Sequence, residues 1–146
     1  MVRRAMMAAA VAAACWMVTI VTAVGVHGQG GGRGGGWTIP PTAATEKSPL
    51  TVNDTVLAAG KKLFTSKCQH CHGTLGKGDG PDADPAHKTD MDLTLAARAA
   101  RNPDGTVFYK IWNGRTTPKM PAFSEELTKE QVWSIVAYVQ TLRAKQ

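Results

Sequence analysis

Apolar residues recur at helical spacing near the C-terminal end of the chain. They stand three or four residues apart, at Val132, Ile135, Val136, Val139 and Leu142. Thr128 and Gln131 form a capping-box pattern just before them, in which each side chain bonds the other residue's backbone N–H. Arg143 carries a positive charge that suits a helix C-terminus. The pattern therefore predicts a final helix that begins near Thr128.

A second apolar pattern predicts a helix from Asn53 or Asp54 to about Lys67. One face of this helix collects Val56, Leu57, Gly60, Leu63 and Phe64. Asparagine and aspartate are favoured residues at a helix start because their side chains accept a bond from a free backbone N–H. Gly60 lowers helix stability relative to alanine, so its presence indicates the close approach of another element.

Two weaker helices are expected at 94–101 and 105–113, and Gly114 is a plausible stop for the second. We find no run of alternating β-branched residues long enough for a sheet. The sequence therefore predicts an all-α domain over residues 51–146, with about four short helices and long irregular segments. A domain of this kind has a thin core, and something besides side chains is expected to fill it.

The N-terminus carries an apolar run over residues 5–26, preceded by Arg3 and Arg4. A short basic region followed by an apolar core is typical of a secretory signal, although the run is also long enough to span a bilayer. Residues 1–28 are therefore interpreted as a signal peptide or an N-terminal membrane anchor. Either interpretation places the remaining chain outside the cytoplasm.

Residues 29–50 are rich in glycine and proline, and we expect them to form a flexible linker. Trp37 lies within this linker. The sequence leaves open whether Trp37 is exposed or folds back onto the domain.

The composition excludes several classes of protein. The 146 residues include only three cysteines, too few for a disulfide scaffold. The formal charge of +6 is mild, and no basic cluster with interleaved aromatic residues is present, which argues against nucleic-acid binding. Aromatic residues make up 6% of the chain, in keeping with a thin core.

The segment Cys68-Gln69-His70-Cys71-His72 has the Cys-x-x-Cys-His spacing of a c-type haem attachment site. Each thiol can add to one vinyl group of the haem, and His72 is then placed to bind the iron. A redox Cys-x-x-Cys, a zinc site and a simple disulfide are the alternatives. They are disfavoured because a βαβ pattern and a second pair of zinc ligands are both missing from the sequence.

Met120 is the expected second iron ligand. It lies between Pro118 and Pro121, which stiffen a non-helical loop that can present the thioether. Met91 also lies in irregular chain and is a rival, although it could be a core filler. His87 is a second rival, but its neighbours indicate a solvated loop.

The ordered series of motifs resembles class I c-type cytochromes, specifically the small bacterial mono-haem cytochrome c domains. The resemblance covers about residues 51–143 and rests on an ordered series of segments: Gly60-Lys61-Lys62-Leu63-Phe64, Cys68 to Gly73, Gly76 to Pro81, Asp92-Leu93-Thr94, Trp112-Asn113-Gly114-Arg115, Met120-Pro121-Ala122-Phe123 and the closing helix from Trp133 to Leu142. It implies that Cys68 and Cys71 are attached to the haem and that His72 and Met120 are its axial ligands. It also implies that the first and last helices cross, with Gly60 and Phe64 against Tyr138 or its neighbours. Met91 departs from the pattern, since many relatives carry proline there.

The expected function is that of a periplasmic single-electron carrier, not an enzyme, with one covalently attached haem c. The alternatives are an electron-transfer subunit tethered to a dehydrogenase or terminal reductase, and an open-iron peroxidase or gas-binding sensor. The expected partners are redox proteins with acidic docking surfaces, and residues 5–26 provide a membrane tether if they are retained. A basic rim could steer such partners, or its charges could simply be dispersed for solubility: Lys67, Lys77, Lys110, Arg115 and Lys119.

Overall fold

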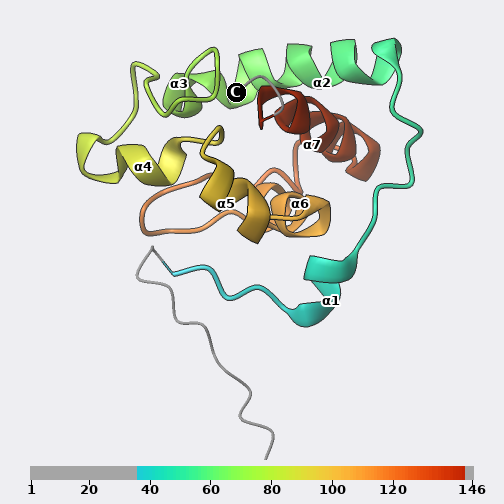
Figure 1. Cartoon of the computed structure of the whole chain (residues 1–146), viewed down its shortest axis with the longest axis horizontal. Coiled ribbons are helices and arrows are strands. Elements are labelled where there is room, and N and C mark those ends of the chain that lie inside the picture. The colour runs from blue at the N-terminus through green and yellow to red at the C-terminus, as the bar shows by residue number, and fades with distance from the viewer. Residues whose placement is uncertain (1–35, 144–146) are drawn as a thin grey trace, which may run out of the picture. The chain divides into compact units, whose positions relative to one another are not determined.

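The computed structural model describes residues 36–143, so the predicted signal or anchor at 1–28 lies outside the described residues. The elements are α1 (Pro41–Thr45), α2 (Asp54–Lys67), α3 (Gln69–His72), the 3₁₀ helix η1 (Pro85–His87), α4 (Lys88–Met91), α5 (Ala96–Arg101), α6 (Asp104–Asn113) and α7 (Lys129–Arg143). Over residues 36–143 the only β-type pairings are two isolated bridges, Lys77 with Asp92 and Arg115 with Met120. The all-α prediction is confirmed (Figure 1). Among these residues, no helix combines the length and the apolar character that a bilayer crossing requires.

The two strongly patterned helices form where the sequence predicts them. The Asn53 side chain accepts a hydrogen bond from the Val56 backbone N–H at 3.0 Å, which caps α2. Before α7, the Thr128 backbone N–H donates to Gln131 Oε1 at 2.8 Å, and the Gln131 N–H donates to Thr128 Oγ1 at 3.3 Å. This reciprocal pair is the predicted capping box.

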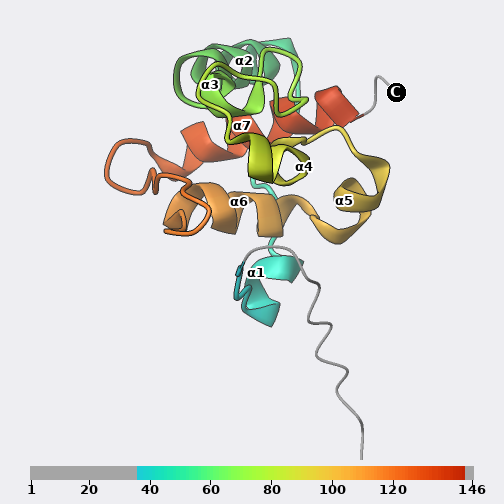
Figure 2. The same cartoon turned by 90° about the vertical axis from the view of Figure 1, so that its left-hand side faces the viewer.

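Helices α2 and α7 pack against each other through Gly60. A Cβ atom built on Gly60 would lie 2.0 Å from the carbonyl oxygen of Ser134 on α7, a distance that real contacts do not reach. One turn further on, the rings of Phe64 and Tyr138 lie 5.4 Å apart and tilted. The expected crossing of the first and last helices is therefore confirmed (Figure 2).

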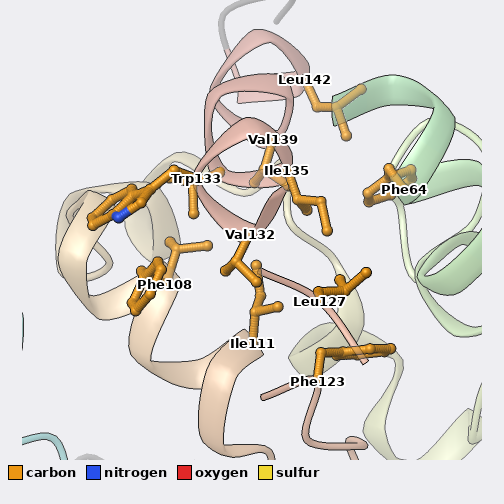
Figure 3. Close-up of a cluster of buried hydrophobic side chains, with 12 residues drawn as sticks. Phe64, Phe108, Ile111, Phe123, Leu127, Val132, Trp133, Ile135, Val139 and Leu142 are labelled. Carbon is orange, nitrogen blue, oxygen red and sulfur yellow. The ribbon is translucent and has the colours of Figure 1, made fainter. Parts of the chain in front are cut away.

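The core lies between α2, α6 and α7. Figure 3 shows Phe64 of α2 and Ile111 of α6 on either side of the side chains from α7. On α6, Phe108 stacks on Trp133 with ring centroids 4.4 Å apart and on Trp112 at 5.7 Å. The contact with Trp133 fixes α6 against α7, and α6 in turn leads into the loop that holds Met120.

The short elements differ more from the sequence predictions. The expected weak helices are found as α5 and α6, shifted by one or two residues at their N-terminal ends. The sequence analysis missed α1, α3, α4 and η1, each of five residues or fewer. Such segments are too short to show a helical period in their side chains.

The stretch at 29–50 differs from the expected flexible linker in its described part. Residues 41–45 form α1, which packs on α6 and buries Ala43. A Cβ atom on Gly105 of α6 would lie 2.1 Å from the Ala43 carbonyl oxygen and 2.7 Å from that of Glu46. The glycine at 105 thus allows a close backbone approach that the composition of the linker does not indicate.

Candidate haem site

The Cys-x-x-Cys-His segment lies at the junction of α2 and α3. Cys68 ends α2 and precedes α3, and its carbonyl oxygen accepts bonds from the N–H of Cys71 at 3.3 Å and of His72 at 3.0 Å. Gly73 then ends the turn with a positive φ of 77°. This single turn holds both thiols and the imidazole of His72 within a short stretch of chain.

The imidazole of His72 is fixed by a backbone carbonyl. Its Nδ1 lies 2.6 Å from the Met91 carbonyl oxygen, which can only accept, so Nδ1 carries a proton. Burial lowers the pKa of His72, which favours the neutral ring. A neutral imidazole with its second nitrogen bonded to a carbonyl is the usual form of a metal-binding histidine.

Met120 is held by a tight loop that follows α6. The Arg115 N–H donates to the Met120 carbonyl at 2.8 Å, and the Met120 N–H donates to the Arg115 carbonyl at 2.9 Å. Gly114 begins the loop with a φ of 60°, and a Cβ atom there would lie 2.4 Å from the Ala122 nitrogen. The Phe123 N–H donates to the Ile111 carbonyl oxygen at 3.1 Å, and this bond connects the far end of the loop to α6. The backbone of Met120 is therefore well anchored.

One cavity brings these residues together. Its volume is about 350 Å³, and Cys68, Cys71, His72 and Met120 all line it. Volumes of this order are typical of small-molecule and cofactor sites. The apolar part of its wall comes from several elements: Phe64, Leu93, Val107, Ile111, Phe123, Ile135 and Val139.

The rival ligands take different places. Met91 also lines the cavity, and its carbonyl is the partner of His72. His87 is not among the lining residues, and its Nδ1 lies 2.7 Å from Asp84 Oδ2. The structure therefore brings Met120 and Met91 to the cavity and leaves His87 outside it.

A cluster of positive charge forms part of the cavity wall. Lys110 donates to Asn102, and Arg98 pairs with Asp90. Burial and the charges of Arg98, Arg115 and Arg143 lower the pKa of Lys110 to about 8, against the opposing effect of Asp90. Three carboxylates also line the cavity, Asp82, Asp90 and Asp92, but the cations on its wall outnumber them. Such an excess of positive charge suits a ligand that brings negative charge.

The two cysteines of the motif are free thiols, and both are half-buried. Burial, with Cys71 nearby, raises the pKa of Cys68 to about 12, and burial also raises the pKa of Cys71. Thiolates, the form that binds zinc or acts in redox exchange, are therefore disfavoured. Within residues 36–143, no group of three or more His, Cys, Asp or Glu side chains is arranged to hold a metal ion by itself.

The cavity fits a haem on three grounds. It is largely apolar, two thiols lie on its wall, and the imidazole on that wall has a fixed tautomer. The cluster Arg98, Lys110, Arg115 and Arg143 on the same wall would offer positive charge to the two carboxylates of a haem. Sequence reasoning missed this cluster, the Met91 carbonyl and the place of Trp37 on the cavity wall. The cations stand on three helices and on the loop after α6, and no sequence pattern links them.

Comparisons with known proteins agree with this site. The family model for cytochrome c matches residues 57–143. A cytochrome c6 of Parathermosynechococcus lividus is 33% identical over 89 residues, which cover 61% of this chain and 93% of the relative. A cytochrome c6 of Rippkaea orientalis is 37% identical over 82 residues, covering 56% of this chain and 67% of the relative.

A solved structure is also similar. It is a chain of the Kuenenia stuttgartiensis reducing HAO-like protein complex, with a TM-score of 0.55 and 29% identity. The match covers 65% of the present chain but only 47% of that chain, so the present chain corresponds to about half of it.

The matched region contains the whole Cys-x-x-Cys-His segment and the Met120 loop. The domain carries a covalently bound haem c and acts in electron transfer. The chain therefore belongs to the cytochrome c family, as a small class I c-type cytochrome.

Proposed function

We propose that the chain is a periplasmic carrier of single electrons whose haem is attached through Cys68 and Cys71 and ligated by His72 and Met120. The observation that carries the proposal is the one cavity lined by all four side chains, with His72 Nδ1 bonded to the Met91 carbonyl. When bound, the haem supplies the one-electron exchange between ferric and ferrous iron.

Each residue has a distinct part in this function. Cys68 and Cys71 would hold the haem through thioethers, and the Met91 carbonyl orients His72 so that Nε2 would be available to the iron. The thioether of Met120 would be the second protein ligand, and a thioether favours the reduced iron and a comparatively high potential. An iron held by both side chains would offer no site to a substrate.

The proposed location and partners rest on the sequence and on surface charge. Residues 1–28 would direct export, and 5–26 would tether the protein to the membrane if they are retained. Lys77 and Lys119 are exposed and suit an acidic redox partner. The predicted rim is narrower than expected, because Lys110 and Arg115 are only half-exposed and Lys67 pairs with Glu126 at 2.6 Å.

A ligand exchange tests the proposal. Replacing Met120 by alanine should abolish the iron–sulfur absorption band of the oxidised protein and lower the reduction potential. Met91→Leu is the matched control, because it removes the other thioether at the cavity and keeps the backbone carbonyl that bonds His72. A band lost in Met91→Leu and kept in Met120→Ala would reverse the assignment.

Covalent attachment is tested separately. A denaturing gel stained for haem should show haem on the native chain and none on the double variant Cys68→Ala, Cys71→Ala. Rapid binding of carbon monoxide by the reduced native protein would contradict a filled iron and favour a peroxidase or gas sensor.

A tethered electron-transfer subunit is a second candidate. It is favoured by the similar chain of the Kuenenia stuttgartiensis complex, since the present chain corresponds to only part of that chain. A native gel of extracts from the source organism distinguishes the two candidates: a free carrier migrates at its own mass, and a subunit migrates with a larger complex.

A further inference from the structure

Trp37 lies on the wall of the haem cavity although it precedes the part of the chain that matches the cytochrome c family, residues 57–143. Its ring is half-buried. The ring centre is 5.0 Å from the guanidinium carbon of Arg115 and 5.4 Å from Lys110 Nζ. Trp37 therefore contacts two members of the cationic cluster, at distances typical of cation–π interaction.

The chain before Trp37 passes near the Met120 loop, and the chain after it packs on α6. A Cβ atom built on Gly36 would lie 3.9 Å from the Thr117 carbonyl oxygen, so the segment runs beside the loop that carries Met120. After Trp37, α1 packs along α6, with Ala43 only 6% exposed and Gly105 allowing the backbones to touch (Figures 1 and 2). The packing of α1 on α6 and the contacts of the ring with Lys110 and Arg115 thus hold Trp37 at the cavity.

We propose that residues 36–50 form a strap that completes the haem pocket, with Trp37 as the residue that covers Lys110 and Arg115 at the cavity wall. The proposal rests on the proposed function, since it concerns the same haem. Trp37 acts through the two cations and by excluding water, and is therefore a positioning residue.

The physical effect of the strap follows from dielectric screening. An aromatic ring over two cations displaces water, so their field acts on the haem in a medium of lower dielectric constant. A positive field favours the added electron of the ferrous state. Solvent access around a metal site is also a known determinant of its reduction potential. The strap should therefore stabilise the reduced protein.

The test uses the full haem-loaded chain with Trp37→Ala and Trp37→Phe. At a fixed ambient potential, Trp37→Ala should lower the ratio of reduced to oxidised protein by about threefold or more. Trp37→Phe should stay close to the native ratio, because phenylalanine still covers the cations. Equal ratios in the native protein and Trp37→Ala would overturn the proposal.

A second variant lifts the strap without touching the aromatic ring. Gly105→Ala places a methyl group against the Ala43 and Glu46 carbonyl oxygens, and Gly105 does not line the cavity. It should shift the ratio in the same direction as Trp37→Ala. Faster amide exchange over residues 41–45 would show that α1 is displaced in Gly105→Ala. If the ratio of reduced to oxidised protein then stayed at the native value, the result would contradict the strap.

The position of Trp37 is tested without any redox titration. In proton–nitrogen NMR spectra, its indole N–H, assigned by its loss in Trp37→Phe, should shift between the oxidised and reduced states. Trp112 is the internal reference, because it lies outside the cavity lining. A shift of Trp37 no larger than that of Trp112 would contradict the proposal. These outcomes are distinct from failure of the proposed function, which would appear as absent covalent haem or an unchanged spectrum in Met120→Ala.

Discussion

At the scale of single residues, Lys110 lies in surroundings that disfavour its charge. Its ammonium group lies near Arg98, Arg115 and Arg143, with Asp90 as the nearby carboxylate, and its pKa falls to about 8. A fold rarely keeps such a charge excess on a cavity wall unless a ligand offsets it. The two haem carboxylates would do so, and the ammonium form of Lys110 would then be stabilised.

Lys110→Gln should lower the reduction potential. Removing a positive charge near the haem disfavours the added electron, and the ratio of reduced to oxidised protein at a fixed ambient potential should fall by about fivefold. Lys62→Gln is the control, since Lys62 is exposed on α2 and does not line the cavity. Redox titration of both variants checks the prediction. Equal shifts would mean that the effect comes from net charge and not from the place of Lys110.

At the scale of elements, the sequence predicted the helices whose signals are local. Both α2 and α7 have a periodic apolar face and a cap of standard chemistry, and their bounds follow directly. The presence of Gly60 also indicated a close approach that α7 provides. Helix α1 could not be foreseen in this way, because it is five residues long and its burial depends on Gly105, which lies far along the chain.

The site, like the helices, has parts with a local sequence signal and parts that depend on tertiary contacts. The Cys-x-x-Cys-His motif is contiguous, so the attachment chemistry could be inferred from it. The Met91 carbonyl and the cationic cluster are products of the tertiary fold, since a backbone oxygen has no sequence signature. Residue 91 bonds His72 through its backbone carbonyl, so the bond does not depend on whether the side chain there is methionine or the proline of many relatives.

Gly60→Ala should destabilise the domain, although alanine has the higher helix propensity. The new methyl group would meet the Ser134 carbonyl oxygen and force α2 and α7 apart, at a cost of about 2–4 kcal/mol in the free energy of unfolding. Ala59→Gly is the matched control at an exposed position of α2, where the cost should be about 1 kcal/mol from propensity alone. Denaturant unfolding of the haem-loaded proteins measures both. A Gly60→Ala protein more stable than native would refute the close contact.

At the scale of the whole molecule, the cavity is large relative to the domain. Phe64, Ile111 and Ile135 contribute both to the core cluster and to the cavity wall, so core and site share one surface. A cavity left empty in a core costs about 24 cal/mol per Å³. For 350 Å³ this is about 8 kcal/mol, which is comparable to the total stability of about 5–15 kcal/mol of a small domain. The haem is therefore expected to act as part of the core.

The chain without haem should accordingly lose most of its ordered structure. The double variant Cys68→Ala, Cys71→Ala, purified free of haem, is expected to show a weak helical signal in far-ultraviolet circular dichroism and no cooperative unfolding transition. The haem-loaded native chain should show the strong helical signal expected from α2, α6 and α7, and a single cooperative unfolding transition. The two substitutions replace small thiol side chains by alanine, so they remove little packing by themselves. The control is the single variant Cys71→Ala, in which the haem is still attached through Cys68. If the haem-free chain unfolded cooperatively with native helix content, side chains alone would suffice to form the core, and the estimate from the cavity volume would be wrong.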